Sequence, residues 1–150
     1  MLTNNFLSVL TTLFTNSNSY KSPGRDITYY EGSTTTVYPA NFYSSNASMR
    51  IGTGTTPAKR TDYKLESEIS SENYTSNYNV VATTSYDIEN SSLTIQATFT
   101  NIGSEDLLVS EVGAFGSNMP QFSFMWARKV FDQPITIAVG ETKSFVIDLF

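Results

Sequence analysis

The alternation of apolar and polar side chains over residues 93–100 constrains the fold of this chain more than any other feature. The apolar set is Leu93, Ile95, Ala97 and Phe99, and the polar set is Thr94, Gln96, Thr98 and Thr100. A period of two places each set on its own face of an extended strand, whereas a helix would scatter both sets around its circumference. The stretch therefore predicts an amphipathic β-strand.

Similar strand-like runs recur along the chain and are separated by short turn signals. They cover residues 27–30, 34–38, 48–52, 78–82, 107–115, 122–131, 135–139 and 143–150, with turns expected at 101–106, 116–120, 132–134 and 140–141. The composition agrees, because 20 Ser, 20 Thr and 12 Asn stand among 150 residues of which only 15% are charged, and Thr favours strands whereas Ser and Asn favour turns. No long helical period separates the strands of the second half, which argues against a parallel α/β fold. We expect an all-β protein, an antiparallel β-sandwich of jelly-roll-like or Ig-like type.

The N-terminal segment departs from this pattern and predicts an amphipathic helix over residues 1–16. Six apolar residues recur there at spacings of three and four: Leu2, Phe6, Val9, Leu10, Leu13 and Phe14. Such a stripe forms one face of a helix, which packs either on its own domain or on a neighbouring chain. The segment is too short and too polar to span a bilayer, it lacks the basic start of a secretory signal, and its polar face carries no Lys or Arg, so no membrane partner is expected.

Three segments follow from these patterns. The helix of residues 1–16 leads into a Ser/Asn/Thr-rich extended arm with short strands, residues 17–48, and then into the sandwich domain, residues 49–150. Within this domain, residues 61–69 indicate one or two helical turns, with Leu65 and Ile69 spaced to face the core.

The residues that the chain lacks exclude several kinds of chemistry. There is no His and no Cys, which excludes disulfides, imidazole acid–base catalysis, thiol nucleophiles and metal sites built from His or Cys. The net charge of −5 argues against nucleic acid as a partner. The charge is uneven: residues 1–61 hold five basic and two acidic side chains, a balance of +3, and the remainder holds four basic and twelve acidic ones, a balance of −8. Neighbouring copies of such a chain attract one another if these regions meet.

The acidic clusters give no catalytic, cofactor or metal assignment. They lie at Asp62/Glu66/Glu68/Glu72, Asp87/Glu89 and Glu105/Asp106/Glu111. Any acidic β protein offers carboxylate pairs of this kind, and no EF-hand-like Asp-x-Asp-x-Asp-Gly loop is present. The glycine-rich residues 52–57 lack the Gly-Lys-Ser/Thr of a phosphate-binding loop. We therefore assign no catalytic residue, no cofactor and no metal ligand.

Glu111 and Arg128 stand out because each interrupts an apolar strand face. By simple alternation, Glu111 shares a face with Leu107 and Val109, and Arg128 shares one with Trp126 and Val130. A charge on an apolar face is costly unless it is paired. We expect the two side chains either to form a structural ion pair across neighbouring strands or to reach solvent separately at strand ends.

The order of several C-terminal motifs resembles structural proteins of tailed bacteriophages. In that pattern a "TNTG"-like turn leads into a strand reading "EVGLF", an "AR…F" strand follows, and a "GET" turn opens the last strand. The chain has Thr100-Asn-Ile-Gly103, Glu111-Val-Gly-Ala-Phe115, Ala127-Arg128-Lys-Val-Phe131 and Gly140-Glu-Thr142. The upstream Gly52-Thr-Gly-Thr-Thr-Pro57, Asp62-Tyr63-x-Leu65-Glu66 and Leu2-Thr-Asn-Asn-Phe6 also fit it. Ile102 and Ala114 depart from it, and residues 15–48 match no part of it.

This resemblance implies a non-enzymatic subunit of a bacteriophage virion, in the tail, collar or a surface appendage. Its partners would be other virion proteins and further copies of the same chain, as a homo-oligomer. The alternative is a host-surface module of a phage fibre, in which the Tyr-rich residues 26–46 bind a glycan, because Tyr in a Ser/Thr/Asn setting suits adaptable binding surfaces. Such Tyr residues also serve as cross-strand packing pairs.

Overall fold

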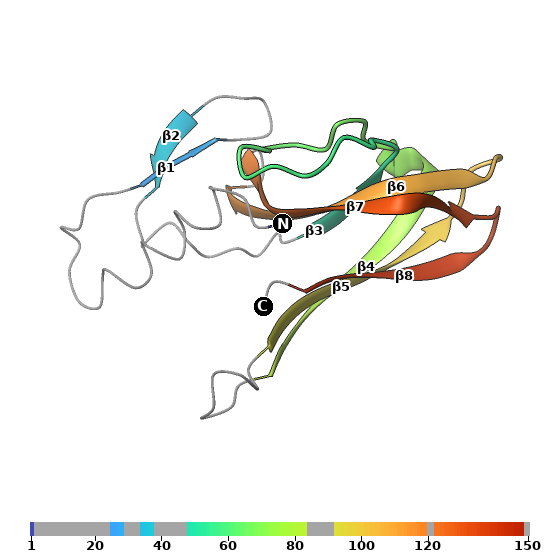
Figure 1. Cartoon of the computed structure of the whole chain (residues 1–150). Helices are drawn as coiled ribbons and strands as arrows, with labels where there is room; N and C mark the ends of the chain where they lie inside the picture. The colour runs from blue at the N-terminus through green and yellow to red at the C-terminus, as the bar shows by residue number, and fades with distance from the viewer. Residues whose placement is uncertain (2–24, 29–33, 38–47, 84–91, 120–121, 149–150) are drawn as a thin grey trace.

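The computed structural model describes residues 1, 25–28, 34–37, 48–83, 92–119 and 122–148 (Figure 1). Residues 2–16 of the predicted N-terminal helix, which include all six residues of its apolar stripe, lie outside this part of the chain. The same holds for most of the arm, of which the structure describes a two-stranded antiparallel hairpin formed by β1 (Arg25–Thr28) and β2 (Thr34–Val37). The first of these strands begins two residues before the predicted range 27–30.

Six further strands form two antiparallel three-stranded sheets. One sheet has the order β3-β6-β7, with β3 at Ser48–Gly52, β6 at Leu107–Met119 and β7 at Phe122–Ile137. The other has the order β4-β5-β8, with β4 at Tyr74–Thr83, β5 at Ser92–Asn101 and β8 at Thr142–Asp148. The described residues contain almost no helix, only the 3₁₀ turn η2 at Ser71–Asn73. The described residues are mostly β, and the expectation of antiparallel sheets is confirmed.

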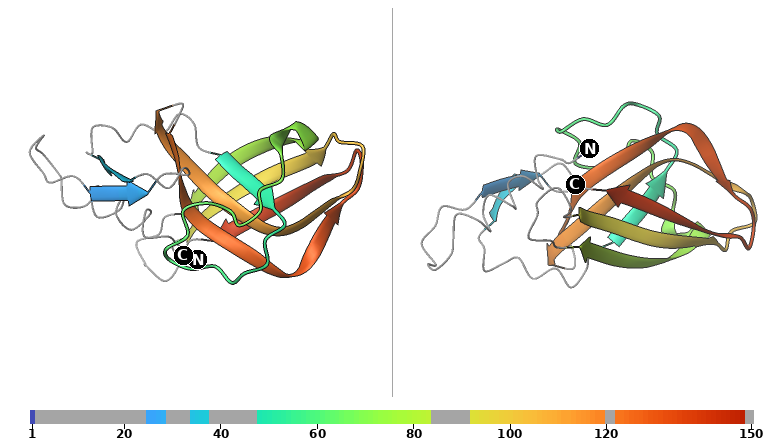
Figure 2. Two further views of the ribbon diagram at one scale, coloured as in Figure 1. Left: turned by 90° about the horizontal axis from the view of Figure 1, so that it is seen from above. Right: turned by 60° about the horizontal axis from the view of Figure 1, so that its bottom comes forward.

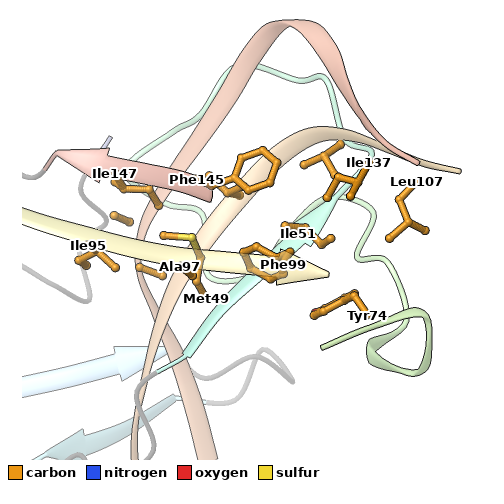
Figure 3. Close-up of a cluster of buried hydrophobic side chains, with 14 residues drawn as sticks. Met49, Ile51, Tyr74, Ile95, Ala97, Phe99, Leu107, Ile137, Phe145 and Ile147 are labelled. Atoms are coloured by element: carbon orange, nitrogen blue, oxygen red, sulfur yellow. The ribbon is translucent and has the colours of Figure 1, made fainter. Parts of the chain in front are cut away.

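Both sheets contribute side chains to one buried core, and Figures 1 and 2 show them as two layers. The core comprises Met49, Ile51, Tyr74, Ile95, Ala97, Phe99, Leu107, Val109, Val112, Ala114, Ala127, Ile137, Phe145 and Ile147. Phe99 lies near its centre (Figure 3), with edge-to-face contacts to Tyr74 at 5.2 Å and to Phe145 at 5.7 Å between ring centroids. Along β5, Ile95, Ala97 and Phe99 are buried and the intervening residues are only partly buried, as the alternation predicted.

Two turns expected from the sequence lie within strands instead. The predicted loop at 116–120 is shorter, because β6 continues to Met119, which pairs with Phe122. The predicted turn at 132–134 lies inside β7, where residues 131–134 bulge opposite Ser110 alone, between the pairs Glu111↔Val130 and Val109↔Ile135. Pro134 is tolerated there because β7 is an edge strand and a bulged residue need not donate to the ladder.

The helical turns predicted over residues 61–69 are absent. Residues 53–69, which we call the strap, cross the outer face of the β3-β6-β7 sheet without regular structure (the green loop in Figure 1). Their backbone bonds go elsewhere: Thr53 donates to the carbonyl of Ser67 at 2.8 Å and Ile69 to that of Ile51 at 3.0 Å. Because these groups pair across the strap and with β3, they do not form i→i−4 helical bonds.

Among the described residues, no helix has the length and hydrophobicity needed to cross a bilayer.

Candidate functional site

The bulge in β6 and β7 places Glu111 on the outer face of its sheet. Val109 faces the core before the bulge and Val112 faces it after the bulge, so the alternation shifts by one residue between them. A one-residue shift turns every following side chain to the other face of a strand. Glu111 thus points away from Val109, under the strap, and the face assigned to it by simple alternation is wrong.

Glu111 is completely buried and accepts hydrogen bonds on both carboxylate oxygens. Its Oε1 accepts from the backbone N–H groups of Ser67 at 2.9 Å and Gly54 at 3.1 Å. Its Oε2 accepts from the backbone N–H of Glu66 at 3.2 Å. The relative exposure of Glu111 is 0%. The carboxylate therefore ties both limbs of the strap to the sheet, and it supplies the acceptors that a helix would otherwise have provided.

Arg128 lies beside Glu111 and joins it to two further carboxylates of the strap. Its Nε donates to Glu111 Oε2 at 2.7 Å, one Nη donates to Asp62 Oδ2 at 2.9 Å, and the other donates to Glu66 Oε2 at 3.5 Å. Arg128 is 3% exposed and pairs with Gly113 in the register of β6 and β7. The structure thus brings together the two charged residues singled out in the sequence. We call Asp62, Glu66, Glu111 and Arg128 the strap network.

The carboxylates outside the sheet are themselves held by the strap backbone. Asp62 Oδ2 accepts from the N–H of Lys59 at 2.8 Å. Glu66 accepts from the N–H and the hydroxyl of Thr56, at 2.8 and 2.7 Å. The hydroxyl of Thr56 is the largest cause that lowers the pKa of Glu66 below 4.5. Burial alone would lower the pKa of Arg128, but its hydrogen bonds to Asp62 and Glu111 raise it.

Two glycines allow the strap to approach the carboxylates this closely. A Cβ on Gly52 would lie 2.5 Å from Glu111 Oε1 and 2.6 Å from the carbonyl oxygen of Ser67. A Cβ on Gly54 would lie 2.5 Å from Cβ of Glu66 and 2.6 Å from Glu111 Oε1. Any side chain at either position would push the strap off the sheet. The glycine-rich run 52–57 therefore binds a carboxylate of its own chain.

A small apolar cluster completes the contact between the strap and the sheet. Leu65 packs with Phe115 and Met125, which point to the same side of the sheet as Glu111. The guanidinium of Arg50 lies 4.5 Å from the ring centroid of Phe115 and 3.5 Å from Glu68. The strap is thus anchored by Leu65, by Ile69, which packs against the core, and by several polar bonds.

The strap network holds the strap against the β3-β6-β7 sheet. All four network residues bond within the chain, and the hollow beside them, about 380 Å³, is lined by Asp62, Tyr63, Lys64 and Arg128 among others. Within the part of the chain that the structure describes, no group of three or more acidic, His or Cys residues is arranged to hold a metal ion. The guanidinium of Arg128 occupies the space between the three carboxylates.

Sequence reasoning singled out Glu111 and Arg128 but missed Asp62 and Glu66 as their partners. The spacing of Leu65 and Ile69 favoured a helical turn over this segment. The glycines at 52 and 54 were the signal for an unusually close backbone approach. The helix-face residues Leu2, Phe6, Val9, Leu10, Leu13 and Phe14 lie outside the described residues.

No protein-family model, no curated protein and no solved structure matches this chain. The resemblance to phage structural proteins therefore depends on the residues of the chain alone.

Proposed function

We propose that the chain is a non-enzymatic structural subunit of a bacteriophage virion, in the tail, collar or a surface appendage. It acts by multivalent packing against other virion proteins and further copies of itself. Its domain is a β-sandwich of jelly-roll-like or Ig-like type, spanning residues 49–150. The N-terminal segment, residues 1–16, forms an amphipathic helix that docks on a neighbouring chain.

One observation carries this proposal: the motifs that resemble phage proteins meet in a single place. Glu111 comes from the "EVG" strand, Arg128 from the "AR" strand, Gly54 from the glycine-rich run, and Asp62 and Glu66 from the Asp-Tyr-x-Leu-Glu segment. These residues lie far apart in the sequence and share one network. The polar residues of the phage-like motifs hold the strap on its sheet, and this supports a structural role for these motifs.

The composition of purified particles tests the proposal. Particles produced by the genome that encodes the chain would be banded on a density gradient and analysed by quantitative mass spectrometry. We expect the chain in several copies per particle, in a constant ratio to the major structural proteins, and antibody against it should label one region of the particle. A chain that is abundant in the lysate and absent from intact particles would overturn the proposal.

The host-surface alternative makes a different prediction. It assigns glycan binding to the Tyr-rich residues 26–46, of which the structure describes the backbone of β1 and β2. A glycan array probed with the purified full chain separates the two functions: specific binding supports the fibre module, and the scaffold proposal expects none.

A further inference from the structure

One end of the two sheets, which we call the tip, exposes apolar side chains within an acidic surface. It consists of η2, the β5–β6 turn and the β7–β8 turn. These loops are joined by backbone bonds: Gly103 donates to Asn73 at 3.1 Å and Gly140 donates to Asn101 at 3.0 Å. Ile102, Val139 and the nearby Leu108 are 56%, 54% and 54% exposed.

The tip is acidic as well as apolar. Glu72, Glu105, Asp106 and Glu141 are all exposed there, and the nearby cation Lys143 lies 3.4 Å from Glu141. An exposed apolar group with a charged rim is typical of a surface that binds a protein. The charge indicates that the partner is basic at the point of contact.

The bend of the strap provides a basic surface of this kind on the same chain. Lys59, Arg60 and Lys64 are exposed, and among the described residues no carboxylate forms an ion pair with any of them. The acidic side chains Asp62 and Glu66 bond to Arg128 instead. The strap network thus separates the charges of the strap, with acids toward the sheet and bases toward solvent. The hollow lined by Lys59, Tyr63 and Lys64 lies beside this bend.

The two surfaces face away from each other. Figures 1 and 2 show the strap bending back over its sheet, away from the end where the β5–β6 and β7–β8 turns lie. A surface at one end that is complementary to a surface elsewhere on the same molecule makes a heterologous contact, which produces a ring or a filament.

We propose that the tip of one copy docks on the basic bend of the strap of the next copy, in a head-to-tail contact. The partner is a second copy of this chain, because the chain carries both the acidic apolar surface and its basic complement. The contact rests on the proposed function, of which it specifies one assembly surface. Multivalency within a particle would strengthen such a contact well beyond its pairwise affinity.

Charge reversal on the full chain tests the contact by sedimentation at concentrations up to about 1 mM. The strap variant is Lys59→Glu/Arg60→Glu and the tip variant is Glu72→Lys/Glu105→Lys; none of these four side chains makes a hydrogen bond or ion pair among the described residues. The wild-type chain should self-associate at low salt and dissociate near 1 M NaCl, where the Debye length is about 3 Å. Each variant alone should weaken self-association at least about tenfold, since its two contact surfaces now carry like charges.

An equimolar mixture of the two variants decides the matter. The acidic strap of one variant meets the basic tip of the other, and the unchanged surfaces also match, so association should return to the wild-type level. The control Asn77→Lys places a charge on an exposed side chain of β4, outside both surfaces, and should leave association unchanged. Circular dichroism should show equal thermal midpoints for all variants.

Two results would overturn the contact: a strictly monomeric wild-type chain, or variants whose mixture associates no better than each alone. A chain that is monomeric and yet present in purified particles would overturn the contact and keep the proposed function. A chain whose two variants associate only when mixed, but which is absent from particles, would support the contact and overturn the proposed function.

Discussion

At the scale of the residue, a buried carboxylate is stable here because every part of it is bonded. Glu111 loses all contact with solvent, a cost that only a paired and hydrogen-bonded charge can offset. Three backbone N–H groups and the Nε of Arg128 provide that compensation. The same bonds hold the strap on the sheet. One buried side chain therefore helps to position all 17 residues of the strap, 53–69.

A double-mutant cycle measures how strongly Glu111 and Arg128 are coupled. Glu111→Ala and Arg128→Ala should each lower the free energy of unfolding by about 3–5 kcal/mol, because each leaves a buried charge without its partner. The double variant should lose less than the sum, by at least about 1 kcal/mol. It should not recover fully, since the three backbone donors stay without Glu111. Urea unfolding gives these values, and strictly additive losses would contradict the coupling.

Tyr78 presents the opposite case, a buried polar group without compensation. Its hydroxyl has no hydrogen-bond partner among the described residues, and burial raises its pKa to about 12. Tyr78→Phe should therefore stabilise the protein by about 1 kcal/mol, because an unpaired buried hydroxyl is removed.

The alkaline limb of the stability curve checks the same residue. Because the pKa of Tyr78 is raised in the folded protein, the neutral phenol contributes to the free energy of unfolding. This contribution is fully present below pH 10, the usual pKa of tyrosine, and is lost as the pH rises toward 12. The Phe variant should lose less stability over this range than the wild type. Equal losses in both proteins would show that Tyr78 does not titrate from a buried position.

At the scale of the element, the bulge in β6 and β7 determines which side chains share a face. Period-two patterns predicted the strands well, because alternation along one strand depends on that strand alone. The bulge sets four residues of β7 against Ser110, and this mismatch depends on how two strands pair. No single-strand pattern contains that information. The sequence therefore indicated a pair between Glu111 and Arg128 but placed Glu111 on the wrong face.

The strap was harder to predict for a related reason. Asp62, Leu65, Glu66 and Ile69 have helical spacing, and local preference favours a turn of helix there. The acceptors that replace the helical bonds come from Glu111 and Ile51, which lie in other elements. Tertiary hydrogen bonds override the local preference at this position.

The close approach of the strap makes a direct prediction for Gly54. Gly54→Ala should destabilise the protein by about 1–3 kcal/mol, as overpacking at a tight contact does, since its Cβ would lie 2.5 Å from Glu66. The neighbouring exposed Thr55→Ala is the matched control and should change stability by less than about 0.5 kcal/mol. Thermal unfolding of both variants gives the comparison, and equal effects would contradict the close contact.

The strap should also loosen in acid. The pKa of Glu66 lies below 4.5 in the folded protein, so its ionised carboxylate contributes to the stability of the fold. This stabilisation is present above pH 4.5 and is lost as the pH falls through the lowered pKa. Glu66→Gln should lower the thermal midpoint at neutral pH, and the difference from the wild type should shrink well below pH 4.5. A difference that is the same at both pH values would show that the carboxylate charge is not what holds Thr56.

At the scale of the whole molecule, the buried hydrophobic side chains of the described residues come from residues 49–147. Met1 adds two backbone bonds to Arg128, its N–H donating at 2.6 Å and its carbonyl accepting at 3.0 Å. Met1 is thus a part of the N-terminal segment that contacts the sandwich. We propose that the sandwich domain is stable by itself and that the N-terminal segment serves assembly.

Deletion of residues 1–16 tests whether this segment serves assembly or the fold of the sandwich domain. The shortened chain should keep a cooperative thermal transition, with a midpoint lowered only slightly by the loss of the two bonds between Met1 and Arg128. It should fail to join the particle, because the six apolar residues of the predicted helix are lost. Burial of each such side chain contributes about 1.5–3 kcal/mol before entropy costs. A sharply lowered midpoint or loss of expression would show that the helix belongs to the core of its own domain.

A cryo-electron microscopy map of the intact particle tests the central claim most directly. We predict density that fits the two sheets in several symmetry-related copies, each in contact with its neighbours. Particles that contain no such density, or copies that touch no neighbouring protein, would contradict the claim that this chain is an assembly subunit.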